Sequence, residues 1–189
     1  MPRFVNFISN GQYSVGCTGR TVYVYDKDKN ELARFKDLPY AYTPMFSPDG
    51  KIFIVKSTEG RLAVYSLDEL KLIKKFRYSK VDYSQDDGFC FSPDGKEFYN
   101  VERHVDNCKT ALSIYDTSDF SLKKRLFEKD TDTVLSTIEY DSENQCYCVM
   151  GFFHTEINNR YFVAKLIDDK LENITDISGK EFFLYAIGR

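Results

Sequence analysis

Two histidines carry the clearest chemical potential in this chain. His104 lies near Glu102 and Asp106, and His154 stands two residues before Glu156. Imidazole nitrogens and carboxylate oxygens are ligands that zinc and related metals accept. Both histidines fall in predicted loops at equivalent places in neighbouring repeats, so they could converge on one metal. The polarity of loops explains them equally well, because the sequence holds no third histidine to complete an ordinary ligand set. We expect no cofactor, and the weak metal candidates are His104, Asp106, His154 and Glu156.

The five cysteines do not form the spacing of a disulfide framework, and their number is odd. Cys146 and Cys148 share one face of a predicted strand, because side chains two residues apart project together. Buried free thiols are a more common arrangement than a metal-binding pair at such positions. We therefore interpret both as buried thiols.

Motifs typical of enzymes are missing from the sequence. It contains no Gly-x-Ser-x-Gly elbow, no phosphate-binding glycine loop and no dinucleotide fingerprint. The segment from Asp26 to Asn30 begins like a calcium loop, but Glu31 occupies the place of the required glycine. A polar hairpin turn explains that segment better. Glu139, the single carboxylate assigned to an inner strand, has no evident partner for acid–base catalysis. Binding is therefore favoured over catalysis.

Tyrosines gather where one repeat leads into the next. Pro39-Tyr40-Ala41-Tyr42 forms one such connection, and the segment from Tyr78 to Tyr83 forms another, close to several aspartates. Tyrosine is enriched at protein interfaces, because its rigid ring buries much area while its hydroxyl stays hydrogen-bonded. These tyrosines could equally cover the ends of adjacent repeats. The predicted binding residues are Tyr40, Tyr42, Tyr78, Tyr83, Asp86, Asp87, His104 and His154.

A repeated sequence motif predicts the strands and turns that hold these residues in place. Met45-Phe46-Ser47-Pro48-Asp49-Gly50-Lys51 returns as Cys90-Phe91-Ser92-Pro93-Asp94-Gly95-Lys96. Each copy places a Pro-Asp-Gly turn between two apolar runs, which is typical of a β-hairpin corner. The turn predicts positive φ at Gly50 and Gly95. Valine at either position should then cost on the order of 1–3 kcal/mol.

Four units of similar length follow from these corners, over residues 3–38, 39–79, 80–131 and 132–179. Each unit contains four short runs rich in β-branched and aromatic residues, as strands require. Units of roughly 40–50 residues with four strands are typical of propeller blades. A last apolar stretch within residues 180–187, Phe182–Ala186, predicts an extra C-terminal strand. We interpret residues 1–189 as a single domain.

Phe46–Lys51, Phe91–Lys96, Val24-Tyr25-Asp26 and Ile114-Tyr115-Asp116 resemble phrases of the WD40-like and TolB-like β-propellers. The resemblance covers most of residues 3–185 and implies an all-β fold, a β-propeller of about four four-stranded antiparallel blades. The chain departs from the family in having no tryptophan, Tyr-Asp where Trp-Asp is usual, and no Gly-His pair before the inner strand. Propellers include enzymes and scaffolds alike.

Charge and hydropathy narrow the range of partners. The formal net charge is −3, from 29 acidic and 26 basic residues, and the densest basic run is Lys123-Lys124-Arg125. This balance disfavours nucleic acid, because nucleic-acid-binding domains carry a basic patch or stripe. No stretch approaches the ~20 apolar residues of a membrane span, and the first residues lack a signal-peptide core. We expect a cytoplasmic protein that binds neither nucleic acid nor membrane.

The leading hypothesis is a non-enzymatic protein- or peptide-interaction module that binds through loops on one face. The alternative is a metal-dependent hydrolase or lactonase-like propeller enzyme that uses the loops of His104 and His154; a third possibility is a purely structural part of a larger assembly. The extra strand, if unpaired, would expose hydrogen-bonding edges and favour association. We therefore predict a homodimer in which each copy forms half of a larger propeller. The predicted interface includes Val5, Phe7, Phe182, Phe183 and Tyr185.

Overall fold

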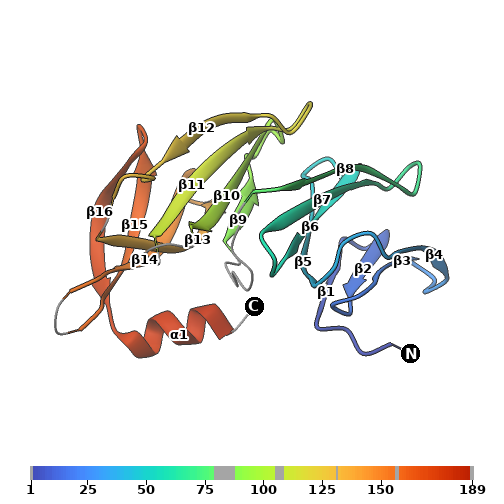
Figure 1. Cartoon of the computed structure of the whole chain (residues 1–189), viewed down its shortest axis with the longest axis horizontal. Coiled ribbons are helices and arrows are strands. Elements are labelled where there is room, and N and C mark those ends of the chain that lie inside the picture. Colours follow the sequence, from blue (N-terminus) through green and yellow to red (C-terminus); the bar gives the residue numbers. More distant parts are fainter. Residues whose placement is uncertain (1, 79–87, 105–108, 131, 156–157, 188–189) are drawn as a thin grey trace. The chain divides into compact units, whose positions relative to one another are not determined.

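The computed structural model describes residues 2–78, 88–104, 109–130, 132–155 and 158–187. The chain forms two compact units, a first unit Met1–Gln85 and a second unit Asp86–Arg189. Each unit contains two four-stranded antiparallel sheets in which consecutive strands are neighbours (Figure 1). The all-β class and the four four-stranded sheets are therefore confirmed. That residues 1–189 act as one domain stays a prediction.

The first unit packs its two sheets against each other. Its core contains Val15 and Val24 from one sheet and Phe53 and Tyr65 from the other, all fully buried. The phenyl ring of Phe53 stacks on the ring of Tyr65 with centroids 4.8 Å apart. The strands of this unit are β1 (Asn6–Ser9), β2 (Tyr13–Cys17), β3 (Val22–Asp26), β4 (Glu31–Phe35), β5 (Ala41–Phe46), β6 (Ile52–Ser57), β7 (Arg61–Ser66) and β8 (Lys71–Arg77).

The second unit repeats this arrangement. Val101 and Leu112 of its first sheet pack against Ile138, Val149 and Phe162 of its second sheet in one core. The strands of this unit are β9 (Phe89–Phe91), β10 (Glu97–His104), β11 (Lys109–Asp116), β12 (Leu122–Leu126), β13 (Thr133–Asp141), β14 (Cys146–Phe153), β15 (Arg160–Ile167) and β16 (Lys170–Ile177).

The two predicted corners adopt the same local structure. Gly50 has φ +68° and Gly95 has φ +70°, which confirms the predicted positive φ. In the first corner the Ser47 hydroxyl donates to Asp49 Oδ1 over 2.7 Å, and the Gly50 amide donates to the Ser47 carbonyl over 3.0 Å. Ser92, Asp94 and Gly95 form the same bonds at 2.7 and 2.9 Å. The repeated phrase therefore encodes one turn geometry, used twice.

The predicted extra strand over 180–187 is wrong, because this segment is the helix α1 (Gly179–Ile187). Ser178 and Glu181 form a capping box: the Glu181 amide donates to Ser178 Oγ over 3.2 Å, and the Ser178 amide donates to Glu181 Oε2 over 2.7 Å. Phe182 is buried and packs on Tyr161, with ring centroids 4.6 Å apart. A helix satisfies its backbone groups internally, so it offers no open strand edge.

Helix α1 covers the face of sheet β13–β16 that points away from the core of the second unit (Figure 1). Within the described part of the chain, no helix is long and apolar enough to cross a membrane.

Candidate functional site

The face of sheet β1–β4 that points away from the core is rich in aromatic side chains. Val15, Val22 and Val24 point into the core, so the alternation of β-strands sends their neighbours to the opposite face. Tyr23 and Tyr25 lie there with stacked rings 6.2 Å apart. We call this surface, formed by Phe4, Phe7, Ser14, Gly16, Tyr23 and Tyr25, the outer aromatic face.

Phe4 reaches this face because Gly16 has no side chain. A Cβ at Gly16 would lie 2.5 Å from the ring of Phe4, so the ring lies directly against the backbone of β2. The Val5 amide donates to the Cys17 carbonyl over 2.8 Å and holds the preceding segment in place. The ring centroid of Phe4 is 5.7 Å from that of Phe7 and 5.9 Å from that of Tyr23. A glycine in a strand often marks such a close approach.

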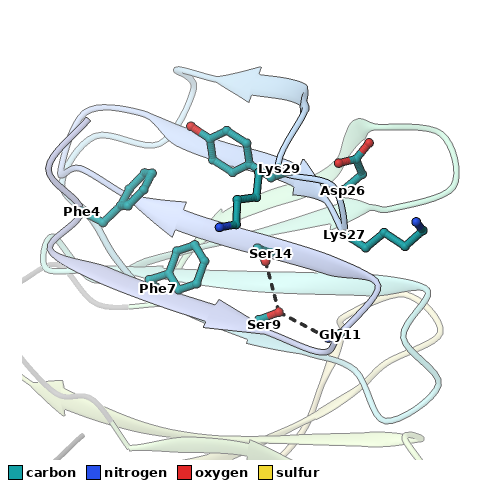
Figure 2. Close-up of a pocket in the computed structure, with 9 residues that line it drawn as sticks. Phe4, Phe7, Ser9, Gly11, Ser14, Asp26, Lys27 and Lys29 are labelled. Carbon is teal, nitrogen blue, oxygen red and sulfur yellow. Dashed lines mark hydrogen bonds between the residues drawn. The ribbon is translucent and has the colours of Figure 1, made fainter. Parts of the chain in front are cut away.

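A hollow of about 520 Å³ opens on the outer aromatic face. Figure 2 shows Phe4 and Phe7 side by side at its base, with the Lys29 side chain extending over the same face. Phe7 is 50 % exposed, which is high for a phenylalanine on a sheet. The hollow is lined by Phe4, Phe7, Ser9, Gly11, Ser14, Tyr25, Asp26, Lys27 and Lys29.

The charged groups at the rim leave one cation unpaired. Asp26 uses its carboxylate within its own turn: Oδ1 accepts the amides of Asp28 and Asn30 at 2.9 and 2.8 Å. Hydrogen bonds from Asn30, first through its side chain and then through its amide, hold the pKa of Asp26 below its usual range. Lys27 pairs with Asp28 over 3.0 Å. Among the described residues, no carboxylate pairs with Lys29, whose ammonium is available to an acidic ligand.

The outer aromatic face has a fully buried counterpart in the neighbouring sheet. In sheet β1–β4 the register pairs Ser14 with Tyr25, and in sheet β5–β8 it pairs Phe53 with Tyr65 at the same place in the repeat. Phe53 and Tyr65 belong to the core between the two sheets of the first unit. The face of sheet β5–β8 that carries Phe53 and Tyr65 is thus covered by a neighbouring sheet. The corresponding face of sheet β1–β4, which carries Ser14 and Tyr25, is exposed.

Three of the predicted tyrosines lie at one end of the first unit. Tyr40 is 53 % exposed and has φ +52°, an unusual conformation for a bulky residue. Its carbonyl accepts the Thr58 amide over 3.2 Å, so this conformation is held by the β6–β7 turn. Tyr42 is half-buried in β5. Tyr78 is buried, its amide donates to the Gly60 carbonyl over 2.9 Å, and Lys56 Nζ lies 5.2 Å from its ring centroid.

The other predicted binding and metal residues are only partly described. His154 is exposed, and its Nδ1 lies 3.1 Å from Asn159 Oδ1. His104 ends β10 and is paired with Lys109, and its side chain lies outside the description. The remaining predicted residues lie outside the described residues: Tyr83, Asp86, Asp87, Asp106 and Glu156.

The backbone places the two histidine-bearing hairpin ends at the same end of the second unit. Thr110, next to the β10–β11 turn, accepts the Leu135 amide through its hydroxyl over 2.6 Å. The His154 amide donates to the carbonyl of Asp132 over 2.7 Å, at the start of the same strand β13. The gathering of the loops that follow His104 and His154, and a metal bound there, both stay predictions.

Glu102, which the sequence associates with His104, is instead fully buried in a structural network. The Tyr115 hydroxyl donates to Glu102 Oε1, and Arg125 Nη2 donates to Oε2 over 3.2 Å. Asn100 Nδ2 also donates to Oε1 over 3.3 Å. Burial is the largest cause that raises the pKa of Tyr115, so its hydroxyl stays protonated. Glu102 is thus used inside the sheet and does not extend into the loop.

Glu139 also has a partner that the sequence did not indicate. The hydroxyl of Tyr185 on α1 donates to Glu139 Oε2. The two residues line a hollow of about 300 Å³ between α1 and sheet β13–β16, together with Thr137, Cys148, Met150, Val163, Ile177 and Glu181.

Comparison with known proteins identifies a fold and no family. Neither a protein-family model nor a curated protein sequence matches the chain. Hydrazine synthase of Kuenenia stuttgartiensis superposes with a TM-score of 0.65 at 16% sequence identity, covering 87% of this chain and 53% of that one. The fold is propeller-like. A eukaryotic initiation factor superposes with a TM-score of 0.58 at 15% identity, covering 93% and 44%. The chain therefore spans about half the length of these structures.

Proposed function

We propose that the protein is a non-enzymatic protein-interaction module that binds its partner on the outer aromatic face. The observation that carries this proposal is a difference between corresponding faces of sheets β1–β4 and β5–β8, whose residues occupy the same positions in the strand pairing. Phe53 and Tyr65 are completely covered by the adjacent sheet, whereas the equivalent pair Ser14 and Tyr25 borders an open hollow beside Phe7. Exposed apolar patches of this type mark interaction sites.

The chemistry of the hollow defines the partner segment. Phenyl and phenol rings line its base, and its volume of about 520 Å³ falls within the range of pockets that hold small ligands or side chains. Lys29 adds a positive charge that no described residue neutralises. The segment that fits best is therefore an apolar or aromatic side chain with an aspartate or glutamate next to it. Such a cation contributes mainly to orientation and association rate.

The end of the first unit that carries Tyr40 offers a second contact. An exposed aromatic ring on a backbone with positive φ is a costly arrangement that clusters at functional sites. Tyr42, half-buried in β5 of the same unit, is proposed as part of this contact. The enzymatic alternative through His104 and His154 has less support, because Glu102 is buried in its own ion pair and His154 contacts Asn159.

Selection from a random peptide library on the immobilised full chain tests this function. We expect enriched peptides to share an apolar residue next to an acidic one. Phe7→Ala should weaken the best peptide about tenfold or more, because truncation of a hot-spot ring costs about 2 kcal/mol or more and each 1.4 kcal/mol or so is tenfold. Lys29→Glu should weaken acidic peptides selectively. Leu32→Ala is the control, since Leu32 is also exposed on this sheet but does not line the hollow.

Enriched peptides that bind Phe7→Ala as tightly as the wild type would overturn the assignment of this face. If such peptides were instead sensitive to Tyr40→Ala, the binding surface would be the tyrosine end of the first unit. Failure to enrich any motif would argue against a peptide-binding module.

A further inference from the structure

The end of the β13–β14 hairpin concentrates metal-binding atoms on one face. The register pairs Asp141 with Cys146 and Glu139 with Cys148. Since side chains two residues apart on a strand point the same way, both thiols and the Asp141 carboxylate project together. One carboxylate oxygen of Asp141 and the sulfur atoms of Cys146 and Cys148 all lie within 4.8 Å of one another.

The two thiols are more accessible than the sequence suggested. Cys146 and Cys148 are both half-buried and are not joined in a disulfide, which corrects their interpretation as fully buried thiols. Their sulfur atoms lie within 4.8 Å of each other. A dissolved ion can thus reach them, while the sheet still excludes part of the surrounding water.

The carboxylate of Asp141 is held in place by its own turn. Oδ1 accepts the amides of Glu143 and Asn144 at 2.9 and 3.1 Å, and Oδ2 accepts Asn144 Nδ2 at 2.7 Å. Carboxylates that bind metals are commonly oriented by such outer hydrogen bonds. Oδ1 uses both of its lone pairs in these bonds, whereas Oδ2 keeps a further lone pair for a ligand.

We propose that Asp141, Cys146 and Cys148 form a binding site for a thiophilic divalent cation of the zinc class. Zinc takes four ligands in a tetrahedron, with Zn–S of about 2.3 Å and Zn–O of about 2.0–2.2 Å. The three donors need only small side-chain rotations to reach such distances, and water completes the fourth position. Binding displaces the two thiol protons to solvent, with no change of oxidation state. Two sulfur ligands disfavour magnesium and calcium, which prefer oxygen.

The charges balance once a divalent cation is bound. Two thiolates and one carboxylate then carry three negative charges, which offset the two positive charges of the ion and the ammonium of Lys165, the residue paired with Cys148 on β15. Glu139, paired with Cys148 on the other side, is engaged by the Tyr185 hydroxyl and is not needed as a ligand.

Titration of the reduced, metal-free full chain with zinc chloride, followed by calorimetry, tests this site. We expect one zinc ion per chain. Cys146→Ser and Cys148→Ser should each reduce zinc affinity by more than about 100-fold, because even outer-shell partners of a metal are worth roughly 10–100-fold. Cobalt(II) should give a thiolate charge-transfer absorption with the wild-type chain that either variant abolishes.

Asp141→Asn and Asp26→Asn provide a matched pair. Both aspartates accept the same kinds of hydrogen bond within a hairpin turn, since Asp26 likewise accepts two amides and the side chain of an asparagine, Asn30. Asparagine keeps the accepting oxygen at either position but removes the charge. Asp141→Asn should lower zinc affinity about tenfold or more, whereas Asp26→Asn should leave it unchanged.

Absence of zinc binding by the reduced wild-type chain would overturn the proposal. Equal zinc affinity of the wild type and both cysteine variants would do the same, because it would place the ion elsewhere. Circular dichroism of each metal-free variant establishes whether the variant is folded. If a cysteine variant does not fold, Asp141→Asn still tests the site.

Discussion

Single aspartates in turns stabilise several corners of this protein. The Ser47 hydroxyl and, after it, the Lys51 amide hold the pKa of Asp49 below its usual value of 3.8, and Ser92 and Lys96 do the same for Asp94. A carboxylate whose pKa is lower in the folded state stabilises the fold above the unfolded-state pKa. That stabilisation is lost as the pH falls through the folded-state value.

We therefore expect the melting temperature to fall steeply between about pH 5 and pH 2. The double variant Asp49→Asn with Asp94→Asn keeps an accepting oxygen at each corner but removes both titrations. Its melting temperature should fall less over the same range, as measured by thermal unfolding at a series of pH values. Parallel curves for the two proteins would show that these aspartates do not contribute to acid sensitivity.

The corner glycines offer a test of backbone conformation separate from packing. A Cβ at Gly50 would meet only Asn10 Nδ2, at 3.7 Å, so a side chain there has space but an unfavourable φ of +68°. Gly50→Val should cost on the order of 1–3 kcal/mol, and Gly50→Asn less, because asparagine tolerates the left-handed region. Chemical denaturation gives both values. Equal stability of the valine variant and the wild type would contradict the turn assignment.

The sequence predicted the roles of residues that contact their neighbours along the chain. It did not predict the roles of residues that contact distant parts of the chain. Ser47, Asp49 and Gly50 are neighbours in sequence, so their turn could be inferred from the phrase itself. The hollow requires Phe4 to lie on Gly16, and nothing in either residue's own neighbourhood indicates that contact. The alternation of Val22-Tyr23-Val24-Tyr25 was a signal for an aromatic outer face that sequence reasoning overlooked.

At the scale of elements, the repeated phrase in the sequence predicted the strands but did not predict the last element, helix α1. The apolar stretch near the C-terminus suits a strand by composition, and short apolar runs do not distinguish strand from helix. The deciding signal was the pattern Ser178-Gly179-Lys180-Glu181, which matches a capping box. In the helix, Phe182 and Tyr185 fall on one side and contact the sheet.

The capping box makes the helix testable. Ser178→Ala should destabilise α1 by about 1 kcal/mol and speed amide hydrogen exchange in the helix roughly fivefold, because the orphan amide of Glu181 loses its acceptor. Ser178→Thr keeps the hydroxyl and serves as the control. Unchanged exchange in the alanine variant would show that tertiary contacts alone hold the helix.

At the scale of the whole molecule, the predicted homodimer rests on exposed apolar surface. The strand edge expected at Phe182–Ala186 does not form, because this segment lies in helix α1, and Phe182 is buried within its own unit. Val5, Phe7, Phe183 and Tyr185 are each about half exposed, as measured by fractions of 53, 50, 53 and 46 %. These residues stay the predicted interface between two copies.

Light scattering at micromolar concentration should therefore report twice the mass of the chain, and a selected peptide should lower that mass towards one chain, because peptide and second copy compete for Phe7. Phe7→Glu should shift the mass to that of one chain, because a buried unpaired carboxylate opposes association. Leu32→Glu, outside the hollow, is the control. A wild-type chain that stays monomeric would exclude the dimer and leave the outer aromatic face available to a different protein.

The most direct test of the central claim is to locate a selected peptide on the protein by NMR. Addition of that peptide to the isotopically labelled full chain should change the amide shifts of β1, β2 and β3 around the outer aromatic face. Gly16→Ala should abolish these changes with little loss of stability, because the added methyl group displaces the Phe4 ring while alanine suits a strand at least as well as glycine. Shift changes confined to other strands, or unaffected by Gly16→Ala, would contradict the account.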